Sequence, residues 1–307
     1  MNFLIKWNTY QKERFPVLIY GLYIFCIVFA VFCFSSYMVP IAAETFLEET
    51  NANTLLPVKF EYEYFKLIPM FIFAFLQFLM VRIVDEFKDF EEDSKYRPYR
   101  PVPRGLVTLK ELKILFKVCV LIQFSISLAY NPDGLILLMG FWIFFALFCQ
   151  DFFIKKFLDK HILITVLIDE LLVAFLALYL SSFVGYVNIK FLWPILLMTY
   201  IVSWIVEIAR KVRCKEDEEE GVKTYTSVIG IGKTTTLLIV LETILMLLQL
   251  YILGTAYLPG IIALYVLTNI INLLFIKNND KKSAKKVELF ANIFIVIVYL
   301  SMGLLIV

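Results

Sequence analysis

Long apolar segments dominate the chain, and short polar stretches separate them. Nine of these segments are long enough, or nearly so, to cross a bilayer as helices of about 20 residues. They cover residues 16–41, 66–84, 112–130, 134–154, 161–183, 189–208, 231–254, 257–276 and 287–307. The first is too long for the apolar part of a signal peptide, so it is interpreted as a true span. The pattern predicts an all-α, polytopic membrane protein with nine transmembrane helices around a central cavity, in which residues 1–307 form a single domain.

The composition supports a membrane protein and narrows the possible chemistry. Hydrophobic residues make up 61% of the chain and charged residues 18%, which excludes a secreted disulfide scaffold, a basic nucleic-acid-binding domain and a disordered chain. Four of the five cysteines stand in apolar runs, where buried thiols are expected. His161 is the only histidine, so a zinc site, a two-histidine haem or a Ser-His-Asp triad is hard to build. Any metal must be held by oxygen ligands, which favours Mg²⁺.

The positions of the basic residues predict the orientation of the chain. With the N-terminus inside, nearly all of the 29 Lys and Arg residues fall on the inner side, and the outer side carries few. This asymmetry fixes topology by the positive-inside rule. We therefore expect an integral multi-pass protein with its N-terminus and both of its acidic loops in the cytoplasm.

An acidic ladder follows the second apolar segment. Asp85, Asp89 and Asp93 recur every four residues, and on a helix this spacing places three carboxylates in one row. Like charges in such a row repel one another, and a divalent cation would relieve the repulsion by binding one or two of the carboxylates. The alternative is a solvated helix end where acidic residues happen to fall.

Arginines and prolines alternate directly after this ladder. Proline stiffens a loop and restricts how its neighbours are presented, and guanidinium groups bind phosphate oxygens in a bidentate manner. A row of acids followed by a stiff arginine loop is suited to a diphosphate group, whose charge the metal and the arginines would share. The residues are Arg97, Pro98, Arg100, Pro101, Pro103 and Arg104.

A second polar patch follows the sixth apolar segment, on the same predicted side. It begins with Glu207, Arg210, Lys211 and Arg213 and continues through a run of acids to Gly221. Because both patches stand where even-numbered spans leave the membrane, we expect them to face each other; a mixed-charge loop is the alternative. The nearby string Gly232-Lys233-Thr234 is not a P-loop, since Ser227 stands where that motif needs glycine and no strand precedes it.

The two patches resemble the motifs of the UbiA superfamily of intramembrane prenyltransferases. That family has nine transmembrane helices and two Asp-rich motifs, at the cytoplasmic ends of helices 2 and 6. Its first motif is N-D-x-x-D-x-x-x-D, followed by R-x-x-R-P and a glycine. The corresponding residues here are Asp85, Glu86, Asp89, Asp93, Arg97, Arg100, Pro101 and Gly105.

The second family motif is altered in this chain. The pattern D-x-x-x-D-x-x-x-G, with a threonine three residues on, is matched by Asp217, Gly221 and Thr224. Arg213 stands at the position of the earlier aspartate, and Glu207 is a candidate substitute carboxylate. The pair Lys155-Lys156 resembles a basic position that contacts diphosphate in the family.

The resemblance implies a Mg²⁺-dependent prenyltransferase that ionises an allylic polyprenyl diphosphate and transfers the prenyl group to a membrane-soluble, aromatic or lipid-like acceptor. It implies no nucleic acid and no protein partner. Two alternatives stay open: a terpene cyclase acting on the same class of diphosphate, and a transporter or non-catalytic scaffold. Expected metal ligands are Asp85, Asp89, Asp93, Glu207 and Asp217, and expected diphosphate contacts are Arg97, Arg100, Lys155, Lys156, Arg210, Lys211 and Arg213.

Two further acids, Asp169 and Glu170, lie about eight residues into the fifth apolar segment. Ionisable groups inside a membrane are costly and usually face a cavity or a partner. Asp169 is therefore a candidate catalytic residue beside Asp89, as a general base or an acceptor-binding group; a structural pair is the alternative. Gln77, Gln123 and Gln150 are expected to form interhelical hydrogen bonds.

Overall fold

A computed structural model describes residues 3–50, 63–185, 188–218 and 222–306. Helices account for most of these residues. Short 3₁₀ turns at Tyr64–Lys66, Pro132–Gly134, Asp151–Phe153, Lys215–Asp217 and Thr255–Tyr257 join some of them. The α-helices are α1 (Phe3–Arg14), α2 (Val17–Thr50), α3 (Leu67–Lys88), α4 (Phe90–Tyr96), α5 (Leu109–Tyr130), α6 (Leu135–Cys149), α7 (Lys155–Leu158), α8 (Ile162–Asp169), α9 (Leu171–Ser181), α10 (Ile189–Arg210), α11 (Tyr225–Ile229), α12 (Ile231–Leu253), α13 (Leu258–Asn278) and α14 (Lys281–Leu305).

The prediction of nine membrane-spanning helices is confirmed for the described residues. Most boundaries agree with the apolar segments, but two differ for physical reasons. The last span begins at Lys281 rather than 287, because the Asp280 carboxylate caps the helix by accepting the Ser283 amide at 2.6 Å. The fourth ends at Cys149 rather than 154, because the backbone turns left-handed at Asp151.

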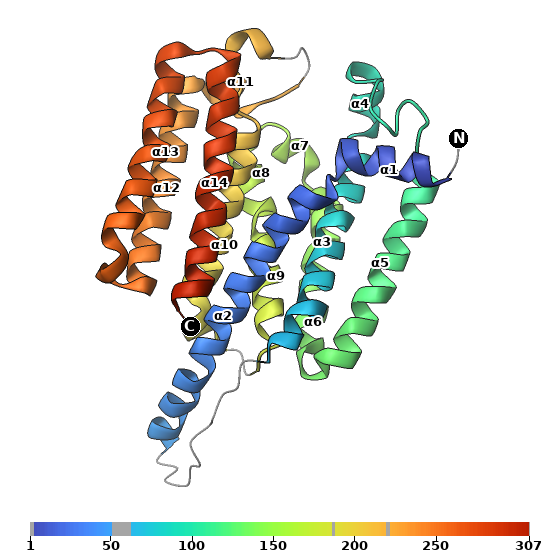
Figure 1. Ribbon diagram of the computed structural model, residues 1–307. Coiled ribbons are helices and arrows are strands. Elements are labelled where there is room, and N and C mark those ends of the chain that lie inside the picture. The colour runs from blue at the N-terminus through green and yellow to red at the C-terminus, as the bar shows by residue number, and fades with distance from the viewer. Residues whose placement is uncertain (1–2, 51–62, 186–187, 219–221, 307) are drawn as a thin grey trace.

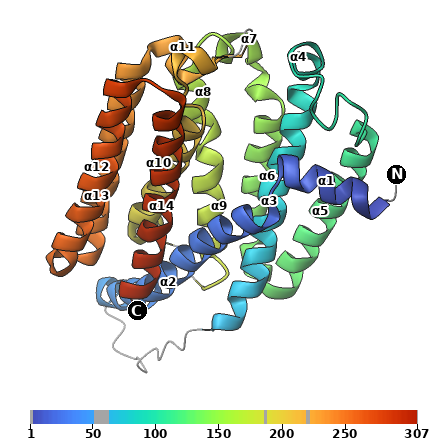
Figure 2. The ribbon, with the colours of Figure 1, turned by 45° about the horizontal axis from the view of Figure 1, so that its top comes forward.

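The helices form a bundle with α2, α9 and α10 at its centre. α12, α13 and α14 lie on one side of it, and α3, α5 and α6 on the other (Figures 1 and 2). α2 contacts α3, α9, α10 and α14, while α10 contacts α2, α9, α12 and α14. The short helices α4, α7 and α11 gather with α1 at one end of the bundle, which we call the charged face (Figure 1). The C-terminal end of α14 lies at the opposite end (Figure 1).

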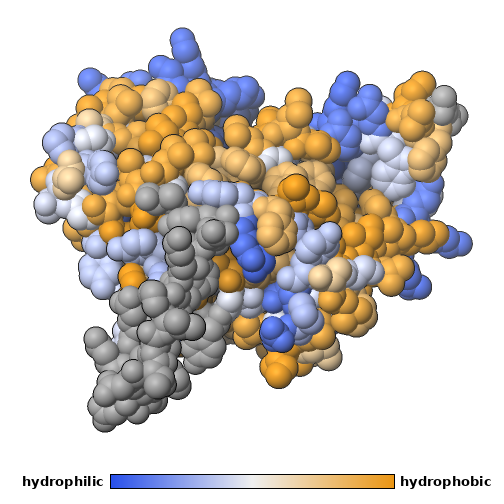
Figure 3. All heavy atoms as spheres, turned by 60° about the horizontal axis from the view of Figure 1, so that its bottom comes forward, coloured by the Kyte–Doolittle hydropathy of each residue, from blue (hydrophilic) through white to orange (hydrophobic). Residues whose placement is uncertain are grey.

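Apolar and aromatic side chains fill the interior and also cover the outside. The rings of Phe73 and Tyr179 lie 4.7 Å apart in the core. Two of the three glutamines join helices as expected, since the Gln123 amide donates to Gln77 at 3.2 Å and to the Phe73 carbonyl at 3.1 Å, whereas Gln150 is exposed. Apolar residues also cover much of the surface seen in Figure 3, which suits contact with lipid.

Candidate functional site

The acidic ladder is built on the end of α3 and the start of α4. Asp89 lies at the bend between the two helices, yet the helical hydrogen-bond pattern continues through it. The Asp89 amide donates to the Asp85 carbonyl at 2.9 Å, and the Asp93 amide to the Asp89 carbonyl at 2.8 Å. The three acids therefore keep the one-turn spacing that the sequence predicts.

Asp93 is buried among arginines. Its side chain is only 3% exposed, and its two carboxylate oxygens accept from Arg100 Nη1 at 2.7 and 2.5 Å. Arg97 Nη1 lies 3.2 Å from the same carboxylate. Arg100 uses a single nitrogen for these bonds, and its other guanidinium nitrogens donate to nothing in the described residues. Asp93 thus anchors the arginine loop at the charged face.

The other two ladder acids form fewer and weaker ion pairs than Asp93. Asp85 lies 3.4 Å from Arg82, at the long end of an ion pair. Asp89 is half-buried and makes no ion pair or side-chain hydrogen bond within the described part of the chain. Burial and the neighbouring Asp93 charge raise the pKa of the Asp89 carboxyl above its usual range, although Arg100 and Lys211 oppose the shift. A cation that added positive charge here would relieve an uncompensated carboxylate.

The second polar patch meets the ladder at the end of α10. Glu207 forms ion pairs with both Arg210 and Lys211. Asp85 interacts electrostatically with Glu207 and Arg210, and Asp89 interacts with Lys211. The structure therefore brings together the end of α3 and the end of α10, as the placement of the two patches on the same side predicts.

The loop after α10 folds away from the ladder. Arg213 Nη1 donates to the backbone carbonyls of Arg210 and Val212, at 3.0 and 2.8 Å. Asp217 pairs with Lys281 at 2.5 Å, and this hydrogen bond lowers the pKa of the Asp217 carboxyl. Asp217 is thus held against the start of α14, and Gly221 lies outside the described residues.

Glu218 closes this loop onto α11. Its carboxylate accepts the Thr224 hydroxyl at 2.7 Å and the Thr226 hydroxyl at 2.8 Å. The same Thr226 oxygen accepts the Arg213 backbone amide at 3.0 Å. Thr224 also caps α11 through the Ser227 amide. The threonine of the second motif therefore shapes the loop, and its acidic partner is Glu218, which the motif comparison did not single out.

The basic pair Lys155 and Lys156 is exposed on the short helix α7. Neither makes an ion pair with the described residues. α7 lies at the charged face (Figure 1), so both lysines are on the predicted side without being drawn into the ladder.

Asp169 and Glu170 stand where the fifth span is interrupted between α8 and α9. The electrostatic partners of Asp169 include Lys88, Asp151 and Asp85. Those of Glu170 include Glu207, and its carboxyl also interacts with Ser203 of α10. These two acids therefore extend the cluster from the charged face toward the membrane interior.

Sequence reasoning missed Lys88 and Asp151. Lys88 Nζ lies 2.6 Å from Asp151 Oδ1, donates to the Phe148 carbonyl at 2.7 Å, and stands 4.1 Å from the centroid of the Phe148 ring. Asp151 adopts the left-handed conformation, with φ 49°. Aspartate tolerates this conformation better than most residues, but no sequence pattern predicts it at this position. The pair ties α3 to the end of α6 beside Asp169.

The donor set suits a hard cation. Within the described residues, no group of three or more His, Cys, Asp or Glu side chains is arranged to hold a metal by itself. Mg²⁺ usually takes one or two protein carboxylates and fills its other positions with water and phosphate oxygens. Asp85, whose ion pair with Arg82 is long, and Asp89, which has no ion pair in the described part of the chain, fit this requirement. Asp93, Glu207 and Asp217 would first have to exchange their present cationic partners.

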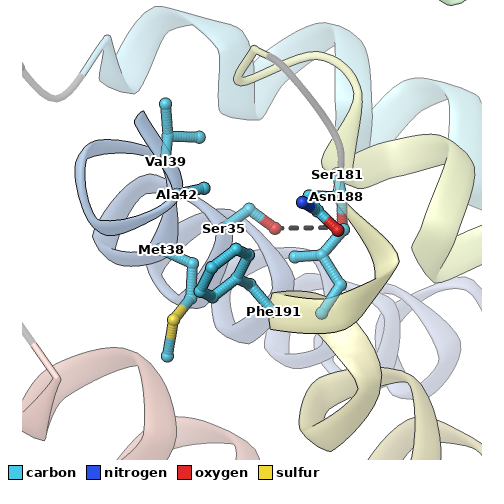
Figure 4. A pocket seen from close by; sticks show the side chains of 8 residues that line it. Ser35, Met38, Val39, Ala42, Ser181, Asn188 and Phe191 are labelled. Atoms are coloured by element: carbon cyan, nitrogen blue, oxygen red, sulfur yellow. Dashed lines mark hydrogen bonds between the residues drawn. The ribbon is translucent and has the colours of Figure 1, made fainter. Parts of the chain in front are cut away.

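A pocket opens far from these acids. Its lining comes from α2, the end of α9 and the start of α10, and it includes Ser35, Met38 and Phe191 (Figure 4). Two of the lining residues are bonded to each other, since the Ser35 hydroxyl donates to the Ser181 hydroxyl at 2.9 Å (Figure 4). Since these segments lie at the end of the bundle opposite the charged face, the pocket does not contain the ladder.

Fold and site together define a polytopic α-helical membrane protein with two charged segments at one face. The sequence model of the UbiA prenyltransferase family matches residues 54–298, and the chain belongs to this family. No curated protein matches the chain.

Two solved structures share the fold. One is of a digeranylgeranylglyceryl phosphate synthase in membranes, with 22% identity, 98% coverage of each chain and a TM-score of 0.59. The other is the apo structure of a UbiA homologue from Aeropyrum pernix K1, with 13% identity, coverage of 92% of this chain and 97% of that chain, and a TM-score of 0.58.

Proposed function

We propose that this protein is a Mg²⁺-dependent intramembrane prenyltransferase that transfers the prenyl group of an allylic polyprenyl diphosphate to a lipid-like or aromatic acceptor. The observation that carries the proposal is the acidic ladder itself: Asp85 and Asp89 lie on the same helical row as Asp93, which anchors the arginine loop through Arg100. Family membership supports the reaction class. The likeness to a digeranylgeranylglyceryl phosphate synthase favours an acceptor that resides in the bilayer.

Binding of the diphosphate rests on the basic groups around this ladder. Arg100 has unused donors directed by its anchor on Asp93, and Arg97 stands beside it. Arg210 and Lys211 contribute charge from α10, and Arg213, Lys155 and Lys156 are further candidates on the same face. Asp85 and Asp89 would hold Mg²⁺, which when bound supplies positive charge that stabilises the departing diphosphate.

The reaction begins when the allylic C–O bond breaks and its electron pair leaves with the diphosphate. The allylic cation must be shielded from water, and the aromatic side chains of the buried core are the candidates for that shield. A nucleophilic atom of the acceptor then forms the new bond to carbon. Asp169, which interacts electrostatically with Lys88 and Asp151, accepts the proton that the acceptor loses.

The same proposal orients the protein in its membrane. The charged face, with the N-terminal helix and both acidic loops, faces the cytoplasm. The support is the concentration of Lys and Arg on this face.

The test uses the purified full-length chain in lipid vesicles. Geranyl, farnesyl and geranylgeranyl diphosphates are each supplied with Mg²⁺, with and without an extract of polar membrane lipids as acceptor, and released diphosphate is measured. Acceptor-dependent release that stops when EDTA removes the metal supports the transferase. The absence of release from every diphosphate, with and without acceptor, would contradict the proposal.

A terpene cyclase is the second candidate, and one observation favours it. Glu207, the substitute acid of the second motif, is occupied by Arg210 and Lys211, so this half of the site differs from the family pattern. A cyclase captures the cation with a double bond of its own chain and needs no acceptor. Cyclic hydrocarbons or alcohols formed without acceptor would therefore assign this activity.

A further inference from the structure

The N-terminal helix α1 lies outside the residues matched by the family model, which begin at 54. It runs across the end of α3 and the start of α5 at the charged face (Figures 1 and 2). Tyr10 of α1 is buried in a small apolar cluster with Ile83, Val102, Val107 and Leu112. This cluster joins α1 to α3, to the arginine loop and to α5. α1 is therefore part of the support on which the loop rests.

Charged residues attach both ends of α1 to the same segments. Near its start, Lys6 pairs with Glu111 of α5 at 2.5 Å. Near its end, Glu13 pairs with Arg104 of the loop at 2.8 Å. The last residue of α1, Arg14, reaches into the ladder region itself.

Arg14 lies between two buried acids of the α3–α4 segment. Its Nε donates to Glu86, whose side chain is 1% exposed, and its Nη2 lies 3.9 Å from Asp93 Oδ2. The Arg14 side chain is only 9% exposed, and Nη2 has no hydrogen-bond partner among the residues that the structure describes. A buried guanidinium nitrogen without a partner is costly, so its position requires a compensating electrostatic role.

That role follows from the charges around Asp93. Glu86 and Asp93 bring two buried negative charges next to the place where a diphosphate would bind. Arg82 neutralises part of the Glu86 charge, at 3.2 Å, but Asp93 depends on arginines from the loop and from α1. Without Arg14, Asp93 and Glu86 would form more ion-pair contacts with Arg100, and their remaining negative charge would repel the diphosphate.

We propose that Arg14 is a positioning residue for the diphosphate. It compensates Glu86 and Asp93, so that Asp93 holds Arg100 by one nitrogen and leaves the other donors of Arg100 to the substrate. The inference rests on the proposed function of the arginine loop. It adds that the N-terminal helix is required for substrate binding, although it lies outside the matched family region.

The experiment measures binding of inorganic diphosphate with Mg²⁺ to the purified full-length protein by calorimetry. Arg14→Gln should weaken binding by about tenfold or more, as expected for groups coupled within one charge network. Arg14→Lys keeps the charge but offers a single nitrogen, so it should recover part of the affinity. Lys6→Met, which removes the ion pair at the other end of α1, is the matched control and should bind like the wild type.

A double-mutant cycle distinguishes positioning from direct contact. If Arg14 acts through Arg100, then Arg14→Gln in an Arg100→Gln background should cause little further loss. Independent, additive losses would overturn the inference, as would wild-type affinity in Arg14→Gln or an equal loss in Lys6→Met. If Arg14→Gln does not fold, Arg14→Lys takes its place in the cycle. Failure of the wild type to bind diphosphate would instead contradict the proposed function.

Discussion

Replacing Asp89 by asparagine should separate the function of the acidic ladder from the stability of the protein. Asparagine keeps the shape of the side chain and removes its charge. Asp89 has no ion pair within the described residues, and Asp85 and Asp93 lie one helical turn to either side. The substitution therefore removes two like-charge repulsions of about 0.2–0.5 kcal/mol each. The free energy of unfolding should stay the same or rise slightly.

The turnover of Asp89→Asn should fall, although its stability does not. If Asp89 holds the metal that stabilises the departing diphosphate, its loss removes a charge aligned with the transition state. Loss of one preorganised electrostatic group typically costs about 10²–10³-fold in rate, or roughly 3–4 kcal/mol of barrier. We expect Mg²⁺-dependent diphosphate release by Asp89→Asn to fall by about this factor.

Two matched variants serve as controls for Asp89→Asn. Asp93→Asn removes a carboxylate that is bonded to Arg100 and Arg97, and breaking a buried ion pair costs about 3–5 kcal/mol. That variant should lower the Tm strongly. Glu92→Gln changes an exposed acid on α4 and should alter neither turnover nor Tm.

The assay is diphosphate release at saturating allylic diphosphate over a Mg²⁺ titration, with thermal unfolding followed in the same lipid or detergent. Wild-type turnover in Asp89→Asn would refute the metal assignment. If Asp89→Asn lowers the Tm as much as Asp93→Asn does, the inference that Asp89 has no ion-pair partner would be refuted.

Three other predictions concern neighbouring groups. Burial and the Asp93 charge raise the pKa of Asp89, so Mg²⁺ affinity should already fall at a pH above the ordinary aspartate pKa of about 3.9. Calorimetry across pH should show a flatter dependence of Mg²⁺ affinity for Asp89→Asn. Asp169→Asn should slow acceptor-dependent transfer and leave inorganic diphosphate affinity unchanged; a matching loss of affinity would place Asp169 in the diphosphate site. Glu242, fully buried in α12, accepts a hydrogen bond from the Asn272 amide at 2.9 Å. Glu242→Gln should therefore preserve the Tm, whereas Glu242→Leu leaves Asn272 unpaired and should lower the free energy of unfolding by about 1 kcal/mol or more.

The fold and the ladder could be predicted because both depend on local pattern. Apolar length alone fixes the number of spans, and a four-residue spacing places Asp85, Asp89 and Asp93 in one row whether or not the helix bends at Asp89. The proposal that the two patches face each other needed only their common side. These features hold because they require no knowledge of side-chain partners.

The distribution of partners could not be predicted in the same way. Asp93 and Asp89 look equivalent in sequence, but folding pairs Asp93 with arginines and leaves Asp89 without an ion pair to any described residue. Arg14 is 72 residues from Glu86 along the chain, and nothing in its neighbourhood marks it as part of the site. Lys88 meets Asp151 only because three consecutive residues turn left-handed after α6. Each of these contacts is a product of tertiary packing.

The odd number of spans within the described residues has a practical consequence for work on the protein. α1 begins at Phe3 on the charged face, and α14 ends at Leu305 on the opposite one (Figure 1). A purification tag before α1 would sit against the helix that supports the arginine loop. A tag after α14 would emerge into the other compartment, where a protease added from that side could remove it without approaching the diphosphate.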